Sequence, residues 1–351
     1  ENDIDLSSLY SDDKNIHAVV TYSEGYDAPA QLALASAYIT NEAGSDVEEV
    51  QISPFYQGLK GPDIHLNRTA LESSQNKKPN SPEELWHKTR FTDHKDGFFE
   101  YKSLRFRSTL PSFRNNFFVT LDNQISLSEE ETSFLRRHSL ILEGKNIQIL
   151  SPYSTGALGI RLNYSDNIGK LDRYRLNVPN PVRSDVRQFA DRAIALDTAY
   201  ISHSETLWPN IYGRVTSGYV EEMFAGAGAE FLYRPYDARY AIGAEGWYTV
   251  KRDPQSTLNL GMITGSETFS GHLKGWYDIP VADATAALKI GRYLGQDFGF
   301  TTSLIKNFDN GINLEGFVTL TDATDINIFG GYTNSVQGVR LSIPLGGYKY
   351  T

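Results

Sequence analysis

Residues 211–252 read IYGRVTSGYVEEMFAGAGAEFLYRPYDARYAIGAEGWYTVKR, and this stretch decides the fold class. Over residues 224–234 the side chains alternate between two kinds. One face comprises Ala225, Ala227, Ala229, Phe231 and Tyr233, and the other comprises Gly226, Gly228, Glu230, Leu232 and Arg234. A period of two residues is the signature of a β-strand with one apolar and one polar face. A helix would scatter these charges around its circumference.

The alternation resumes after a turn at residues 236–238. One face then comprises Tyr240, Ile242, Ala244, Tyr248 and Val250, and the opposite face comprises Glu245, Trp247, Thr249 and Lys251. Gly226 and Gly228 lie inside a strand pattern rather than before a helix, so they do not predict a phosphate-binding loop. They predict a curved strand or a close approach between backbones.

Regular strands are predicted from about residue 193 onward. Turn signals recur at intervals of about 11 to 18 residues, whereas a transmembrane β-strand needs roughly 9 to 11 residues plus a turn. The signals lie near Pro235, Pro254, Ser266, Pro280, Gln296, Asn310, Ala323 and Asn334. The spacing favours a mainly β fold, an antiparallel transmembrane β-barrel with about 10–14 strands in this chain.

The two faces of these strands favour a lipid-facing wall over a soluble sandwich. Polar residues such as Lys274 and Asp278 alternate with apolar ones such as Leu273 and Tyr277. Many residues of the apolar face have small side chains, which suits a lipid-facing wall because lipid needs no interlocking fit. A polar lumen can hold charges of both signs in water. Aromatic residues expected at the membrane interfaces are Tyr233, Tyr240, Tyr248, Tyr277, Phe298, Phe308 and Tyr332.

The composition of the 351 residues narrows the function classes. The formal net charge of -10 argues against a nucleic-acid partner, because such proteins carry basic patches. The chain has no Cys, which excludes disulfides, thiolate metal sites and a cysteine nucleophile.

No apolar run approaches the roughly 18 residues of a transmembrane helix. Residues 1–3 are polar and acidic, unlike a signal peptide, so we expect a mature form or an internal fragment.

The N-terminal part has a different pattern, which predicts a small α/β element. Residues 1–15 look like a polar, mobile arm. A strand over residues 16–22, a helix over residues 30–40 and a strand over residues 48–53 form the α/β element. Residues 54–96 are expected to be mainly loop or linker.

The domain boundary is placed between residues 1–96 and residues 97–351, the second part being the barrel. Further strands are predicted over residues 97–107, 116–127, 140–143 and 157–164. The sequence SEEE at residues 128–131 fits a capping box for a short helix through Arg137. Residues 184–192 are expected to form a helical turn across an opening of the barrel.

Several of these segments resemble a known family. The run YGRVTSGYVEEMFAGAGAEFLYRP at residues 212–235 is followed by AIGAEGWYTVKRD, GHLKGWYDIP, GRYLGQDFGFTTSLIKNFDNG and a final VRLSIPL. Together they resemble the YjbH (GfcD-like) family of outer-membrane proteins from exopolysaccharide and capsule operons. The similarity is strong over residues 193–345 and weak before them. Members of that family are roughly twice as long, usually begin with a signal or lipoprotein segment and continue past the SIPL strand, so the resemblance implies that the chain is a C-terminal half.

The resemblance implies a function in the export or surface assembly of an exopolysaccharide or capsule. It implies a barrel in a Gram-negative outer membrane, with the N-terminal element in the periplasm. The implied partners are a polysaccharide, outer-membrane lipid, other polysaccharide-secretion proteins and the missing half of the same protein, but no nucleic acid. The family offers no catalytic residues, so we expect a protein that is not an enzyme.

Five residues on the predicted lumen face are candidates for sugar binding. Trp247 and Trp276 share that face with Glu245, Lys274 and Asp278. Pyranose C–H groups stack on aromatic rings while the hydroxyls bond to polar neighbours, so this combination is a good sugar platform. The alternative is that the tryptophans plug a narrow barrel.

A second set of residues is interpreted as a structural charge ladder across neighbouring strands. It comprises Arg214, Glu222, Glu230 and Arg234. The pair Glu221-Glu222 is expected to interact with Arg214 or Arg234, and a structural role is favoured over glycan contact. The seven His residues lack metal-ligand spacing, so neither a metal site nor a cofactor nor a catalytic group is predicted.

Two function classes therefore stay open. The favoured one is a non-enzymatic outer-membrane barrel that takes part in exopolysaccharide export, which predicts a protein that leaves membranes only with detergent. The alternative is a soluble, secreted polysaccharide-modifying enzyme or glycan-binding β protein. It predicts a monomer that is soluble without detergent and loses activity or binding when Glu245 or Asp278 is substituted.

Overall fold

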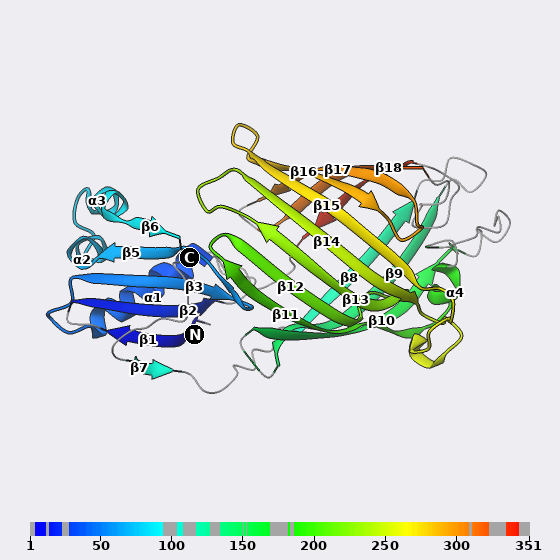
Figure 1. The fold of residues 1–351 in the computed structure, drawn as a ribbon, viewed down its shortest axis with the longest axis horizontal. Coiled ribbons are helices and arrows are strands. Elements are labelled where there is room, and N and C mark those ends of the chain that lie inside the picture. Colours follow the sequence, from blue (N-terminus) through cyan, green and yellow to red (C-terminus); the bar gives the residue numbers. More distant parts are fainter. Residues whose placement is uncertain are drawn as a thin grey trace.

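The computed structural model is mainly β and contains a small and a large β-sheet (Figure 1). The structure describes residues 4–11, 14–22, 28–93, 104–107, 117–126, 134–149, 151, 153–168, 182, 186–308, 311–322 and 335–343. The small sheet, drawn in blue and cyan, lies at one end of the large one. In the described residues, none of the helices is both long and apolar enough to cross a membrane.

The small sheet has the strand order β6-β5-β3-β2-β1-β7, with β4 paired to β3. Its strands are β1 (Ile4–Ser11), β2 (Asn15–Tyr22), β3 (Glu49–Tyr56), β4 (Leu59–Lys60), β5 (Asp63–Asn67), β6 (Arg90–Thr92) and β7 (Leu104–Arg107). Strands β2 and β3 are parallel, and helix α1 (Ala28–Glu42) connects them as in a βαβ unit. The predicted strands and helix of the α/β element are thus confirmed.

The apolar runs of β2 and β3 explain the core of the small sheet. Ala18, Val20, Val50 and Ile52 are almost completely buried in one cluster, against which Ala35 of α1 also packs. Strands of a parallel pair are typically covered on their faces, so they carry near-continuous apolar residues. The crossover helix supplies that cover here.

The prediction of mainly loop over residues 54–96 is wrong for its described part. Helices α2 (Arg68–Gln75) and α3 (Ser81–Lys88) lie in it, as do three of the strands. The Asn67 side chain caps α2 by accepting a hydrogen bond from the Ala70 amide at 3.1 Å. Both helices lie within a polar stretch that resembles a linker.

The predicted mobile arm at residues 1–15 is also wrong where it is described, because β1 pairs with β2. Strand β7, after residue 96, pairs with the other edge of β1 and so belongs to the small sheet. The domain boundary proposed at residue 96 stays a prediction.

The large sheet is a meander of twelve antiparallel strands in chain order. They are β8 (Phe117–Ser126), β9 (Leu135–Gln148), β10 (Ser154–Asp166), β11 (Ile194–Trp208), β12 (Ile211–Tyr219), β13 (Phe224–Tyr233), β14 (Tyr240–Lys251), β15 (Thr268–Ile279), β16 (Ala284–Arg292), β17 (Phe298–Asn307), β18 (Asn313–Thr321) and β19 (Ser335–Ser342). Among the described residues β8 and β19 each pair on one side only and form the edges of the sheet.

Two short helical predictions have different outcomes. Residues 135–137 begin β9, so the predicted helix through Arg137 is wrong there; its capping box at residues 128–131 lies outside the described residues. The helical turn predicted over residues 184–192 is confirmed as helix α4 (Val186–Ala190).

The large sheet has an exposed apolar face, which we call the outer face. Ten of its large side chains are between 45% and 67% exposed: Val215, Phe231, Ile242, Tyr248, Phe269, Leu273, Leu288, Ile290, Leu304 and Leu341. The opposite face, which we call the inner face, carries Glu230, Glu245, Lys274 and Lys289, none of which is exposed. The predicted alternation of apolar and polar residues is confirmed. The apolar side chains are on the exposed face and the charged ones on the less exposed face, whereas water-soluble domains bury mainly apolar side chains.

The sheet curls around its inner face. Arg137 of β9 pairs with Glu222, which lies between β12 and β13, and Leu294 after β16 packs on a cluster that includes Leu135 of β9. Strands so far apart in the strand order can meet only if the sheet is rolled. Figure 1 shows the same curvature, with β8 and β9 passing behind β13 and β14.

The two ends of the rolled sheet differ in their connections. At the end near the small sheet, which we call the turn end, residues 209–210, 234–239 and 280–283 join successive strands. At the opposite end, which we call the loop end, the longest connections occur, at residues 167–193 and 252–267. Helix α4 lies at the loop end (Figure 1).

Candidate functional site

The structure brings four of the five predicted sugar-binding residues together on the inner face. Glu245 and Trp247 belong to β14, and Lys274 and Trp276 belong to the adjacent strand β15. Asp278 shares this face but is exposed near the turn end of β15. Their grouping follows directly from the two-residue period and the antiparallel register. Whether they bind sugar stays a prediction.

Glu245 is the centre of an ion-pair network on the inner face. Its carboxylate accepts from Lys274 Nζ at 2.6 Å and lies 2.9 Å from His272 Nδ1. Glu230 lies directly opposite Glu245 on β13, and Arg214 of β12 pairs with Glu230. Two carboxylates opposite each other would repel, so the flanking cations are needed to hold both on one wall.

The two tryptophans lie against glycines of neighbouring strands. A Cβ atom on Gly228 would lie 2.3 Å from the Trp247 ring, and one on Gly243 would lie 3.2 Å from the Trp276 ring. A Cβ on Gly226 would lie 2.2 Å from a backbone oxygen of β14. The predicted close approach between backbones is therefore confirmed at Gly226, whereas Gly228 makes room for the Trp247 side chain. Each ring therefore lies over a glycine of the neighbouring strand.

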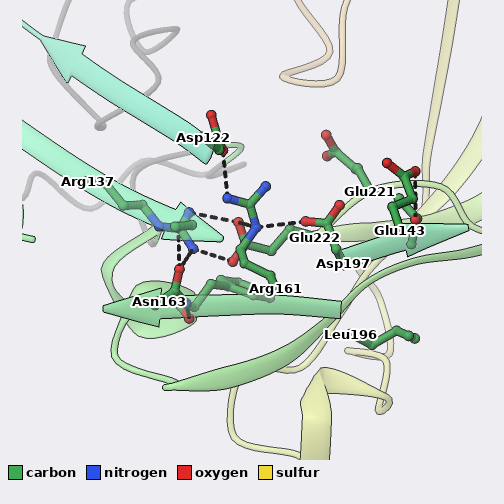
Figure 2. Close-up of polar contacts among 12 residues, drawn as sticks. Asp122, Arg137, Glu143, Arg161, Asn163, Leu196, Asp197, Glu221 and Glu222 are labelled. Atoms are coloured by element: carbon green, nitrogen blue, oxygen red, sulfur yellow. Dashed lines mark hydrogen bonds and ion pairs between the residues drawn. The ribbon is translucent and has the colours of Figure 1, made fainter. Parts of the chain in front are cut away.

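The predicted partners of Glu222 are wrong. Glu222 accepts hydrogen bonds from Arg137 of β9 through both carboxylate oxygens, at 2.5 and 2.8 Å (Figure 2). Arg234 follows β13 whereas Glu222 precedes it, so a whole strand separates them. Arg214 lies opposite Glu230 instead. Of the proposed ladder, the structure joins Arg214 with Glu230 alone.

Arg161 of β10 extends the Glu222 cluster across the interior. Its guanidinium pairs with Asp197 at 2.7 Å and with Asp122 of β8 at 2.7 Å, and it lies 3.7 Å from Glu222 (Figure 2). The side chain of Arg137 is only 2% exposed. Removing one partner from such a buried cluster costs about 3–5 kcal/mol, because an uncompensated charge stays behind.

Arg252, at the loop end of β14, is completely buried and binds backbone oxygens. It donates hydrogen bonds to the carbonyls of Leu196, Glu221 and Asn259, each at 2.8 Å. These belong to β11, to the connection before β13 and to a short 3-10 helix, η2 (Thr257–Asn259). One side chain thus joins the start of β11 to two connecting segments at the loop end.

An apolar cluster fills the interior beside these charges. It comprises Leu135, Ile168, Val186, Phe189, Ala190, Met223 and Phe224. Inner-face residues at the loop end, such as Thr249 and Ser270, are buried, whereas Lys274 and Trp276 nearer the turn end are half-buried. Over the described residues, the inner face is therefore more deeply buried at the loop end than toward the turn end.

The small sheet contacts the turn end through the hairpin of β3 and β4. The Lys60 amide donates to Thr206 Oγ1 of β11 at 2.9 Å, and the Phe55 and Tyr153 rings meet edge to face at 5.6 Å. Gly58 at the hairpin tip has φ +88°, and a Cβ there would lie within 3 Å of the β11 backbone. Only glycine fits this contact.

Burial at this contact changes one titratable group. It lowers the pKa of Lys60 from its ordinary value, although the carboxylates of Asp63 and Glu205 act in the opposite direction. A second contact lies nearby, where the Tyr236 hydroxyl donates to the Phe91 carbonyl at 3.2 Å. The small sheet is therefore held at two places.

No sequence pattern predicts that Arg137, Arg161, Asp122 and Asp197 act together. Alternation on β9 and β10 predicts the face of the arginines but not their partners, which lie 36 to 85 residues away in the chain. Among the described residues no group of three or more His, Cys, Asp or Glu is placed to hold a metal ion.

Comparison with known proteins identifies the family. The YjbH family model, described as "Exopolysaccharide biosynthesis protein YbjH", matches residues 1–349. The chain belongs to the YjbH family of exopolysaccharide biosynthesis proteins. The resemblance found in the sequence is therefore confirmed, and it extends over the small sheet as well as the large one.

One relative of this YjbH chain is the "Uncharacterized lipoprotein YjbH" of Escherichia coli (strain K12). The two are 33% identical over 165 residues, which is 47% of this chain and 23% of the relative. The aligned part is thus a minor portion of the relative. No solved structure matches the chain.

Proposed function

We propose that this YjbH family member is a non-enzymatic outer-membrane β-barrel that takes part in the export or surface assembly of an exopolysaccharide or capsule. The observation that carries the proposal is the polarity of the large sheet. Leu273 is 67% exposed on the outer face, whereas Glu245 and Lys274 form ion pairs on the inner face. Lipid solvates such an outer face, and water or polymer solvates such an interior.

The aromatic residues support a membrane-spanning sheet. Tyr233, Tyr240 and Tyr277 are exposed at the turn end, where Tyr240 and Tyr277 are direct neighbours and the Tyr233 and Tyr240 rings are 6.4 Å apart. Tyr248 and Phe269 are neighbours toward the loop end. Aromatic girdles at both interfaces are typical of outer-membrane barrels. Of the other predicted interface aromatics, Phe298 and Phe308 are exposed, and Tyr332 lies outside the described residues.

The connections support an orientation. Outer-membrane barrels have short periplasmic turns and longer extracellular loops. In this orientation the turn end, with the small sheet, lies in the periplasm, and the loop end, with α4, faces outward. Polymer would then reach the interior from the periplasm, beside the small sheet, which would bind other polysaccharide-secretion proteins. The remaining part of a longer chain would supply further strands.

Fractionation of the full-length protein tests the membrane assignment. We expect the protein to stay in outer membranes until detergent is added and to change gel mobility on heating, as folded barrels do. Release without detergent would contradict the assignment. It would favour the alternative of a soluble polysaccharide-modifying enzyme or glycan-binding protein, with Trp247, Trp276 and Asp278 on its binding face.

Deletion of residues 1–93 tests the role of the small sheet. We expect the large sheet to insert normally, with its heat-dependent mobility shift, while cells stop exporting polymer. Export at the normal level would show that the small sheet does not bind the secretion partners. The insertion assay separates that result from a failure of the large sheet to fold.

A further inference from the structure

One lysine on the inner face has no carboxylate partner in the part of the chain that the structure describes. Lys289 of β16 is half-buried, and its Nζ lies 4.9 Å from the centre of the Tyr293 ring. By contrast, the inner-face cations Arg214, Lys274 and Arg340 each pair with a carboxylate. Unlike these three cations, Lys289 therefore has no direct ion pair within the described residues.

The strand register places a second positive charge next to Lys289. Lys274 and Lys289 lie directly opposite each other on β15 and β16. Like charges in that relation destabilise a sheet unless an anion compensates them. Lys274 is turned toward Glu245, at 2.6 Å, and toward Glu230, at 4.0 Å. The ammonium of Lys289 is left for a ligand.

The groups around Lys289 fit a sugar. Thr301 lies opposite Lys289 on β17, and its hydroxyl is 2.7 Å from that of Tyr293. Trp276 lies opposite Ala287, on the same face as Lys289 and one position nearer the turn end. Aromatic rings stack against pyranose C–H groups, hydroxyls bond to sugar hydroxyls, and an ammonium forms charge-assisted hydrogen bonds with a carboxylate.

We propose that Lys289, with Trp276 and Tyr293, binds the carboxylate of an acidic sugar unit in a polysaccharide that enters from the turn end. This inference rests on the proposed function and adds to it the chemical class of the polymer, a uronate-containing chain. Neutral glycans would lack the charge-assisted contact and bind more weakly.

The test measures binding of a galacturonate hexamer to the full-length protein in detergent by titration calorimetry. Maltohexaose serves as the neutral comparison. We expect Lys289→Met to weaken hexamer binding about 10- to 100-fold, the amount expected for a lost hydrogen bond between charged groups. Lys289→Arg keeps the charge and should retain most of the affinity.

A matched control is Lys306→Met on the adjacent strand β17, since Lys306 already pairs with Asp283 at the turn end. It should leave hexamer affinity within about 2-fold, as expected for a residue that does not touch the ligand. Equal binding of maltohexaose, or an unchanged affinity in Lys289→Met, would overturn the proposal. The heat-dependent mobility shift of each variant shows whether the barrel is intact, so a failure of this site is distinguishable from a failure of the proposed function.

Discussion

The two halves of the interior use the same kinds of side chain in different ways. At the loop end, Arg137, Arg161 and Glu222 are buried and paired, beside an apolar cluster that contains Phe189. Toward the turn end, Lys274 and Lys289 are half-buried, and one of them lacks a carboxylate partner among the described residues. Buried side chains in ion pairs stabilise the fold, whereas charged side chains that stay accessible to water are available to a ligand.

The largest effect that would test this contrast is the loss of Glu222. We expect Glu222→Ala to destabilise the protein by about 3–5 kcal/mol, because Arg137 is left buried without a counter-charge. Glu230→Ala on the wetter half should cost only about 0.2–1 kcal/mol. Urea unfolding in lipid vesicles measures both, and equal losses would show that the two halves do not differ.

The apolar cluster at the loop end should show whether the interior is sealed there. Phe189→Ala removes a fully buried ring and is expected to cost about 3–5 kcal/mol. The remaining cavity should also raise the ion conductance of the protein in planar bilayers, where the parent should conduct poorly. An unchanged conductance despite the loss of stability would mean that other segments close the interior.

The outer face provides a third test, which separates lipid from water as its surroundings. Leu273 lies in the middle of β15, so Leu273→Arg should cost about 2–4 kcal/mol in a bilayer. In water the same exposed substitution should change stability by less than about 0.5 kcal/mol. Val281→Arg in the turn after β15 is the control and should be neutral in either case. Stability is measured by unfolding in vesicles.

The smallest effect is expected where the small sheet contacts the large one. Gly58→Ala places a Cβ against the β11 backbone at a positive φ, which should cost about 1–3 kcal/mol. Faster hydrogen exchange of the Lys60 amide would report the loss of its bond to Thr206. Gly44→Ala is the matched control, since a Cβ there meets nothing within 4 Å. Unchanged exchange in Gly58→Ala would contradict this contact.

Local alternation was sufficient to predict the strands and faces of the large sheet. Glu245 and Lys274 point inward and Leu273 points outward because successive side chains of a strand alternate between its two faces. A shift of one residue in strand pairing would move every side chain of the strand to the wrong face, so the pattern determines the direction of each. The helix α1 and strands β2 and β3 were likewise visible as local patterns. These elements are set mainly by near neighbours in the chain.

Long-range partners and short capped helices could not be predicted in this way. Arg137 meets Glu222 only because the sheet rolls, and the roll depends on all the strands between them. Helices α2 and α3 are short and polar, and their signals, such as Asn67 before α2 and Pro82 within α3, also occur in loops. Packing against the small sheet determines whether such a segment forms a helix or a loop.

The described part of the large sheet has an even number of strands, which constrains how such a chain is assembled. Each of the twelve antiparallel strands reverses the direction of the chain, so the chain enters β8 and leaves β19 on the same side. If the large sheet spans a membrane, as we propose, segments joined before β8 or after β19 would therefore lie in one compartment. Insertion of the large sheet would then require translocation of its hairpins alone, and a neighbouring domain at either end could fold before or after insertion without crossing the bilayer.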